Sequence, residues 1–378
     1  MSTRSLLVVS VDGLRASALG AYGNTTYPTP TFDRLASQSV VYDHYVVDSA
    51  DAGLVATALW TGRHAHHPAP SGQEPSLAKL LQQQGICCRR VTDDPHLANL
   101  PSAADWEEVI LVSPPDHTRA TDAASTAMGG LLATALEVAA DLASQAIPAL
   151  LWIHLSGMWA PWDAPPEFAL SLRDEQQDPD WQPTSEIPHH PDSPPADDDQ
   201  IFIANCRYAG QVMALDDCLA GFCAELAGPT HAGRWDLILM GLRGFPLGEH
   251  GAIGEPVPYN EQFHVPLYYH RADGTHQLTR QSGLIQPSDL YAWLAELPQH
   301  NSPLIPHRNV ALSTAAGRQA IATSQWRGVT AKSGADQMEF ELYVGTDDRW
   351  QANNVASRCP EEVEELNNLL HQLQQAEE

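Results

Sequence analysis

The sequence predicts an α/β fold: a large mixed β-sheet flanked by helices, followed by a small C-terminal antiparallel sheet with one helix. Residues 5–11 form an almost uninterrupted apolar run, which is typical of a central strand buried on both faces. Similar runs at residues 149–155 and 235–240 are separated by longer segments of helical character. From residue 311 the chain changes to short strand-like segments and closes with a polar helix at residues 360–374.

A chain of 378 residues can bury one large core and a small appendage, which we place at residues 1–305 and 306–378. Within the first, residues 170–200 are rich in proline and acids and predict a solvated surface insertion. The remaining elements follow from apolar periodicity. We expect helices at 31–39, 50–61, 76–84, 121–145, 202–226 and 288–297, and strands at 40–47, 86–91, 319–323, 328–332 and 340–344.

The composition excludes several classes of partner. The formal net charge is −27, so nucleic acid and anionic membranes are not expected to bind, because like charges repel. We expect no run that spans a bilayer and no signal peptide, because residues 1–4 lead straight into the first strand. Six cysteines without paired metal spacing fit reduced thiols. We therefore expect a cytoplasmic protein whose partner is another protein or a small ligand.

Asp12 is the first residue with a possible chemical role. It follows the first apolar run directly, and ligand sites in open α/β sheets lie beyond the carboxyl ends of the strands. Asp12 is therefore placed where a metal ligand or a catalytic acid would stand. An aspartate that only caps the following turn is an equally good interpretation of these residues alone.

Several ordered motifs make the chain resemble the sulfatase family of the alkaline-phosphatase superfamily. They are Asp12-Gly13-Leu14-Arg15, Leu19-Gly20-Ala21-Tyr22-Gly23, Thr29-Pro30-Thr31-Phe32-Asp33-Arg34-Leu35-Ala36, Thr61-Gly62-Arg63, Val265-Pro266-Leu267 and Glu341-Leu342-Tyr343. The resemblance implies hydrolysis of a sulfate ester by a cysteine-derived formylglycine in a Cys-x-Pro-x-Arg motif. It also implies a calcium ion and surrounding cations, which neutralise charge on the transferring anion.

The catalytic positions implied by the resemblance are altered in this chain. Counting back from Thr61, the nucleophile falls at Ala52 and the arginine of its motif at Ala56, with Ser49 and Asp51 the nearest polar residues. Alanine can supply neither a nucleophile nor a cation. The two lysine positions fall at Asp93 and Glu255, and a histidine position falls at Trp159. Lys79 and Lys332 are the only lysines in the chain.

The calcium site implied by the resemblance is also altered. The first strand of a family member ends in two acids, whereas this one ends in Asp12-Gly13, and Leu242 and Arg243 stand at two further ligand positions. Calcium takes six to eight oxygen ligands, which Asp12 alone cannot supply. We therefore expect no calcium, with Asp12 the only retained ligand position. We also expect Arg243 to pair with Asp12 in the place of the metal; the alternative is an Arg243 that points into solvent.

The residues predict a sulfatase-like protein that has lost sulfate-ester hydrolysis and has a binding or regulatory role. The alternative is a sulfate or phosphate ester hydrolase that uses non-standard groups such as Asp12, Asp51 or His264; a purely structural protein is a third possibility. Trp159, Trp162, Phe245 and Tyr259 either wall a ligand pocket or fill the vacated cavity. The residues expected around that pocket are Asp12, Gly13, Asp51, Leu242, Arg243, Glu249, His250 and His264.

Overall fold

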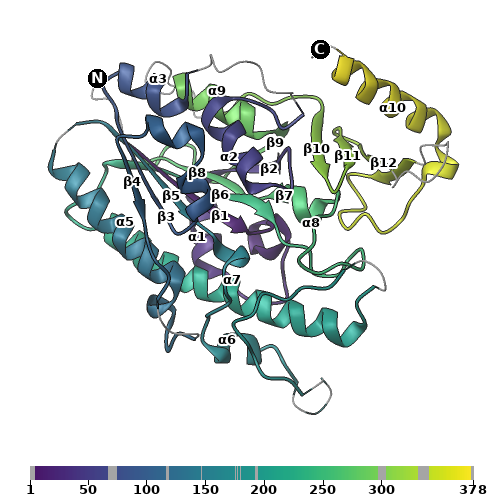
Figure 1. Ribbon diagram of the computed structural model, residues 1–378, viewed down its shortest axis with the longest axis horizontal. Helices are drawn as coiled ribbons and strands as arrows, with labels where there is room; N and C mark the ends of the chain where they lie inside the picture. Colours follow the sequence, from purple (N-terminus) through teal and green to yellow (C-terminus); the bar gives the residue numbers. More distant parts are fainter. Residues whose placement is uncertain are drawn as a thin grey trace.

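Nine strands of the described chain form one mixed sheet (Figure 1). The structure, a computed structural model, describes residues 5–66, 75–115, 119–145, 147–174, 176, 178, 180–191, 195–296, 304–330 and 340–375. The strand order is β4-β3-β5-β1-β6-β8-β2-β7, with β9 paired to β2. The strands are β1 (Ser5–Gly13), β2 (Ser39–Val46), β3 (Cys87–Thr92), β4 (Glu108–Leu111), β5 (Ala149–Leu155), β6 (Trp235–Gly244), β7 (His264–Val265), β8 (Leu267–His270) and β9 (Thr279–Ile285).

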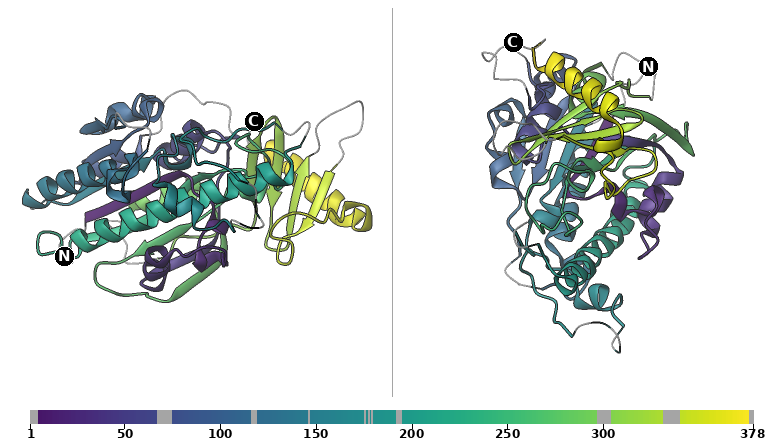
Figure 2. Two further views of the ribbon diagram at one scale, coloured as in Figure 1. Left: turned by 90° about the horizontal axis from the view of Figure 1, so that it is seen from below. Right: turned by 90° about the vertical axis from the view of Figure 1, so that its right-hand side faces the viewer.

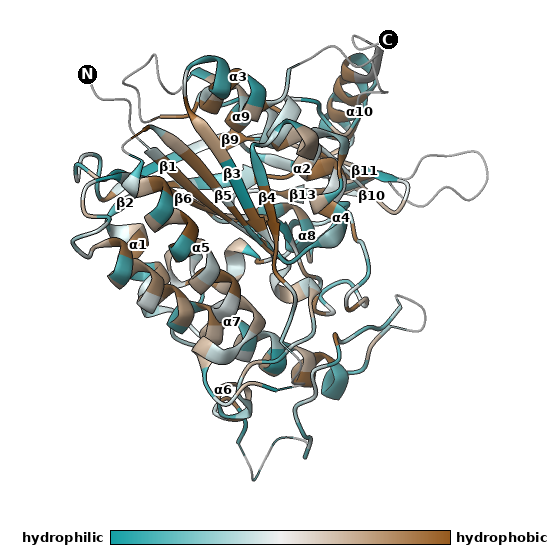
Figure 3. Ribbon diagram, turned by 60° about the vertical axis from the view of Figure 1, so that its left-hand side comes forward, coloured by the Kyte–Doolittle hydropathy of each residue, from teal (hydrophilic) through white to brown (hydrophobic). Residues whose placement is uncertain are grey.

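The centre of the sheet is parallel, which determines where a site can form. β4, β3, β5, β1 and β6 are successive parallel neighbours, whereas β8 joins β6 in the antiparallel sense. The carboxyl ends of β3, β5, β1 and β6 therefore lie along one edge. β1 is buried along its whole length, and Figure 3 shows the hydrophobic colouring of the central strands. The predicted fold class is confirmed.

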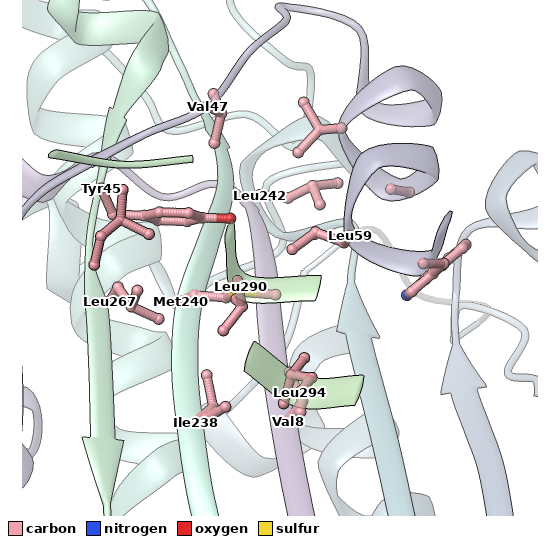
Figure 4. Close-up of a cluster of buried hydrophobic side chains, with 14 of the residues drawn as sticks. Val8, Tyr45, Val47, Leu59, Ile238, Met240, Leu242, Leu267, Leu290 and Leu294 are labelled. Carbon is pink, nitrogen blue, oxygen red and sulfur yellow. The ribbon is translucent and has the colours of Figure 1, made fainter. Parts of the chain in front are cut away.

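Helices cover both faces of the sheet, because alternate side chains of β1 point to opposite faces. Leu7 and Val9 pack with side chains of α1 (Pro30–Ser37), α5 (Ala127–Ser144) and α7 (Asp198–Leu226). Leu6 and Val8 pack in the core that includes α2 (Ala52–Thr61), α3 (Leu77–Gln83) and α9 (Pro287–Glu296). Figure 4 shows part of this second core. The shorter described helices are α4 (Pro95–Ala98), α6 (Pro166–Leu170) and α8 (Asn260–Phe263).

Local signals explain where the helices begin. Asp51 caps α2 by accepting a hydrogen bond from the backbone N–H of Leu54. Asp197 and Gln200 form a capping box that starts α7 four residues before its predicted beginning. By length and composition alone, α5 is the one described helix that is apolar enough to cross a membrane, contrary to the sequence expectation. Its apolar side chains pack against the face of the sheet that carries Leu7 and Val9, which is typical of a core helix.

The C-terminal unit has the predicted composition of strands and one helix. β10 (Ala311–Ala315), β11 (Arg318–Ala322), β12 (Trp326–Thr330) and β13 (Phe340–Val344) form an antiparallel sheet, and α10 (Pro360–Gln375) packs against it. Figure 2 shows this unit at one end of the core domain. A bridge between Ser49 and Thr314 ties it to the segment before α2.

The acidic insertion is less solvated than the sequence predicts. Within its described part, Trp181 is buried against Ala169 and Cys206. His190 also forms a backbone bridge with Ile253. Burying an indole stabilises this segment against the core in spite of its charged composition.

Candidate functional site

Asp12 and Arg243 face each other at the ends of β1 and β6. The pairing register of the two strands shifts between Val11 and Asp12, and this irregularity places Arg243 directly opposite Asp12. Arg243 Nε donates to Asp12 Oδ1 at 2.9 Å, and its Nη2 donates to Asp12 Oδ2 at 3.0 Å. The predicted bidentate pair is therefore confirmed, and the interpretation in which Arg243 points into solvent is wrong.

The Arg243 guanidinium makes two further contacts besides its pair with Asp12. Its Nη1 donates to the carbonyl oxygen of Ala50 at 2.6 Å, which ties β6 to the segment before α2. Its Cζ lies 4.3 Å from the ring centroid of Trp159. The Asp12 side chain is only 3% exposed and that of Arg243 is 17% exposed. The pair is thus a fixed, largely dry element of the strand ends.

Burial governs the ionisation of Asp12. Removal from water raises the pKa of the Asp12 carboxyl, and Arg243 lowers it by less. The nearby carboxylate of Asp94 adds a smaller contribution that raises the pKa of Asp12 further. Arg243 thus offsets part, but not all, of the effect of burial on the pKa of this carboxyl.

Gly13 cannot be replaced by a residue with a side chain without movement of its neighbours. Its φ is +80°, and a Cβ at this position would lie 2.5 Å from the Cβ of Met158. The adjoining Gly157 approaches as closely, because a Cβ there would lie 2.4 Å from the carbonyl oxygen of Asp12. The turn Gly157–Trp159 therefore packs directly on the Asp12-Gly13 corner and leaves no room for a second acid.

Leu242 belongs to the apolar core. It is buried in the same cluster as Leu59 of α2 and Met240 of β6, and Figure 4 shows these side chains together. Ala52 and Ala56, in the first turns of α2, are buried in this cluster as well. The start of α2 therefore presents apolar surface to the strand ends.

A second polar group lies beyond β3. Asp93 accepts hydrogen bonds from the backbone N–H of Ser156 at 2.7 Å and from its hydroxyl at 2.9 Å. Burial raises the pKa of Asp93 to about 6, and these hydrogen bonds offset only part of that effect. Asp93 is thus committed to the segment after β5.

The sequence reasoning missed Asp94 and His154. Asp94 caps α4 through the N–H groups of His96 and Leu97, and its Oδ2 lies 4.0 Å from Nε2 of the buried His154. Burial lowers the pKa of His154 to about 4, so the ring is neutral at pH 7. The Asp94-Pro95 pair, an N-cap followed by proline, was the available signal for the cap. Nothing in the sequence marked His154.

A family model described as Sulfatase matches residues 4–299. The chain belongs to the sulfatase family. The phosphonate monoester hydrolase of Agrobacterium radiobacter is similar in fold, at 15% identity and a TM-score of 0.76, over 99% of this chain and 95% of that one. BT4656, solved with its substrate D-glucosamine-2-N,6-O-disulfate, has 14% identity and a TM-score of 0.71, over 99% and 98%. BT1596, a 2-O GAG sulfatase, has 14% identity and a TM-score of 0.70, over 100% and 93%. None of the curated protein sequences matches.

The donor atoms at the strand ends do not fit the calcium ion that the sulfatase family implies. Both carboxylate oxygens of Asp12 already accept hydrogen bonds from Arg243. Gly13 and Leu242 offer no side-chain oxygen. Within the described residues, no three side chains of histidine, cysteine, aspartate or glutamate are placed to share a metal ion. A hard dication would also lie next to a guanidinium, which is electrostatically unfavourable.

The other predicted pocket residues do not gather around Asp12. Glu249 pairs with Arg15 at 2.6 Å, and Glu255 pairs with His189 at the surface. His264 bonds through Nε2 to the carbonyl oxygen of Asp43, and burial lowers its pKa to about 3. Glu249, Glu255 and His264 therefore each have their own partner and do not converge on the Asp12-Arg243 pair.

His250 serves the contact between the core and the C-terminal unit. Its Nδ1 lies 2.8 Å from Glu261 Oε1 and its Nε2 lies 3.1 Å from the carbonyl oxygen of Gln351. Both partners accept, so the doubly protonated ring satisfies both. Burial lowers the pKa of His250, but the hydrogen bond and charge of Glu261 outweigh it and raise the pKa overall.

The four aromatic residues are divided between two places. Trp159 and Trp162 pack on Phe245, with ring centroids 4.7 and 5.3 Å away. Tyr259 instead stacks on His250 at 3.5 Å, within the contact to the C-terminal unit. Three of the aromatic side chains thus fill space beside the Asp12-Arg243 pair, whereas Tyr259 does not.

The lysines give no cation to the strand ends in the part of the chain that is described. Lys79 is exposed on α3, and Lys332 lies outside the described residues. Asp51, exposed at the start of α2, is committed to its capping hydrogen bond with Leu54.

Proposed function

We propose that this sulfatase-family protein does not hydrolyse sulfate esters and that it has a binding or regulatory role. The observation that carries the proposal is the bidentate contact of Arg243 with Asp12, which uses the one retained metal-ligand carboxylate. Hydrolysis of an anionic ester needs a nucleophile and groups that neutralise charge in the transition state. The nucleophile position implied by the family resemblance carries Ala52, and both oxygens of the Asp12 carboxylate are engaged by Arg243, which supports the proposal.

The charge near the strand ends supports the same proposal. Asp93, directly after β3, is an acid at a position where the family resemblance implies a lysine. Glu255, at the other such position, pairs with His189 at the surface and supplies no cation to the strand ends. A carboxylate a few ångströms from a sulfate group repels it by about 1 to 4 kcal/mol, depending on the effective dielectric. Arg243 offsets this repulsion little, because its charge is already matched by Asp12.

The alternative, an ester hydrolase with non-standard groups, would need to release residues that are already engaged. Asp12 is bound to Arg243, Asp51 caps α2, and His264 is bonded to a backbone carbonyl. These three side chains also make separate sets of contacts, which argues against a shared catalytic arrangement. A nucleophile and its base are expected within hydrogen-bond reach of one another.

The test is a calcium titration of the metal-stripped protein by calorimetry, with hydrolysis of 4-nitrophenyl sulfate, 4-nitrophenyl phosphate and a phenylphosphonate monoester measured in parallel. A catalytically competent sulfatase serves as the control. We expect no heat of calcium binding and no hydrolysis of the three esters above the rate in buffer alone. Stoichiometric calcium binding, or turnover that Asp12→Asn, Asp51→Asn or His264→Gln removes, would reject the proposal and establish the hydrolase alternative.

A further inference from the structure

A cavity of about 300 Å³ lies beside the strand ends, between three segments that are distant in the sequence. They are the loop after β1 at residues 15–27, the face of α7 at residues 202–209, and the loop after β13 at residues 349–350, and Leu172 and Leu247 complete the lining. Its volume is at the lower end of the range of small-molecule sites. The residues that matter for its chemistry are Arg15, Tyr27, Phe202, Tyr208, Arg349 and Trp350.

The charge of the cavity differs from that of the whole protein. The chain carries a formal net charge of −27, yet among the described residues no aspartate or glutamate lines this cavity, whereas two arginines do. Arg15 is 5% exposed and is matched by Glu249 through Nη1, whereas its Nη2 makes no hydrogen bond with any described residue. Arg349 makes no ion pair within the described chain and stacks at 4.6 Å on Trp350. The lining therefore holds one unmatched positive charge and one spare donor.

The walls of the cavity are aromatic, and hydrogen bonds to the backbone fix their position. Trp350 lines the cavity and is 42% exposed, so one side of its indole is open to solvent. The Tyr208 hydroxyl donates to the carbonyl oxygen of Gly13 at 2.8 Å and accepts from the backbone N–H of Arg15 at 3.1 Å. Asn24 fixes the opposite loop by donating to the carbonyl oxygens of Ala18 and Tyr27.

Tyr27 adds a neutral polar group to the cavity. Burial raises the pKa of its phenol, so the hydroxyl stays protonated and can donate. The charge of Arg15 lowers the pKa of Tyr27 by less than burial raises it. A ligand in the cavity thus meets aromatic faces, a phenolic hydroxyl and guanidinium groups.

We propose that this cavity binds a small organic monoanion with a flat apolar body, such as an aromatic carboxylate. The flat body stacks against the aromatic walls, and the carboxylate meets Arg349 and the spare donor of Arg15. A cation is disfavoured by the two arginines, and a strongly charged polyanion would exceed the one unmatched charge. The inference goes beyond the non-catalytic role and holds whether or not the protein hydrolyses an ester.

Calorimetry with three probes of one shape tests the proposal: 2-naphthoate, the neutral 2-naphthamide and the cationic 2-naphthylmethylamine. We expect naphthoate to bind with a Kd of about 0.1 to 1 mM, at least fivefold more tightly than the amide, and the amine not to bind. Arg349→Gln should remove the preference for naphthoate over the amide. Trp350→Ala should weaken both. Arg358→Gln, on an exposed arginine of the same unit, is the matched control and should change neither.

Arg349 and Trp350 are exposed, so their replacement should leave the unfolding temperature unchanged, which thermal unfolding verifies. Equal binding of the three probes, or no naphthoate binding at 5 mM, would overturn the proposal. So would a loss of affinity with Arg358→Gln as large as with Arg349→Gln. None of the probes contains a scissile ester, so these outcomes are independent of the calcium and hydrolysis measurements.

Discussion

Replacement of Arg243 by alanine gives the sharpest test of the strand-end arrangement. Asp12 would be left buried, with its side chain 3% exposed and without its bidentate partner. Removing one member of a buried ion pair typically destabilises a protein by about 3 to 5 kcal/mol. The cost arises because an unpaired carboxylate is poorly solvated in the interior.

The magnitude can be worked out from protonation of Asp12. Without Arg243, the folded protein can avoid the buried charge by binding a proton. An unfolded aspartate has a pKa near 3.9, so protonation at pH 7 costs about 4 kcal/mol, at 1.36 kcal/mol per pH unit. With an unfolding entropy of about 2.1 cal/mol/K per residue, this corresponds to about 5 °C for a chain of 378 residues.

The assay is urea unfolding of wild type and Arg243→Ala at pH 7 and pH 5.5, followed by circular dichroism. The folded variant binds a proton that the unfolded chain releases, so its deficit should shrink as the pH falls. At pH 5.5 we expect a deficit of about 2 kcal/mol. Adding Asp12→Asn to Arg243→Ala removes the charge and should restore part of the stability at pH 7.

Arg280→Ala is the matched control, because Arg280 pairs with Asp43 but its side chain is 50% exposed. Exposed pairs contribute about 0 to 1 kcal/mol, so this variant should unfold nearly as wild type does. A deficit of less than about 1 kcal/mol for Arg243→Ala, or a deficit that does not change with pH, would refute the reasoning. Recovery of the stability of Arg243→Ala on addition of calcium would also refute the reasoning.

Three further predictions concern other parts of the same structure. Gly13→Ala should lower the free energy of unfolding in urea by about 2 to 5 kcal/mol, because the new Cβ overlaps Met158 and the backbone φ is unfavourable for alanine. Gly85→Ala is the control: its φ is also +80° but the space around it is open, so it should cost only about 1 to 2 kcal/mol. Equal costs for the two variants would contradict the overlap with Met158. Asp93→Asn should stabilise the protein by about 1 to 3 kcal/mol at pH 7 and leave its stability nearly unchanged at pH 4. The reason is that burial raises the pKa of the Asp93 carboxyl to about 6, so the buried ionised form is the destabilising one. Destabilisation of the variant at pH 7 would show that the charge is needed. The pKa of His250 is raised in the folded protein, so its stabilising contribution is complete below the unfolded pKa near 6.5 and is lost as the pH rises through the folded pKa. His250→Gln should therefore lower the free energy of unfolding more at pH 6 than at pH 9. The reverse order would exclude a protonated ring.

The sequence could predict the elements whose signals are local. The buried runs of β1, β5 and β6 have no polar interruptions, and the N-cap residues mark the beginnings of α2 and α3. β4, β7, β8, β9 and β10 were not predicted as strands. They are short or lie outside the parallel centre of the sheet, where pairing rather than composition makes them strands.

The same division holds at the candidate site. The sequence, through its family resemblance, predicted that the nucleophile and metal-ligand residues are replaced, and this stays a prediction. The positions of Asp12 and Arg243 at the ends of apolar runs allowed their pairing to be inferred, and the structure confirms that pair. A guanidinium and a carboxylate at adjacent strand ends in a dry environment have a strong reason to pair. This part of the site could therefore be predicted without coordinates.

Tertiary structure alone decided which of the remaining polar residues share a place. Glu249 pairs with Arg15, His250 bridges to the C-terminal unit, and His264 bonds within the antiparallel part of the sheet. The contact of Met158 with Gly13 and the cavity beside Trp350 likewise join segments far apart in the chain. Side-chain partners and cavities depend on how distant segments approach within a few ångströms, and no periodicity or motif in one stretch of sequence encodes that approach.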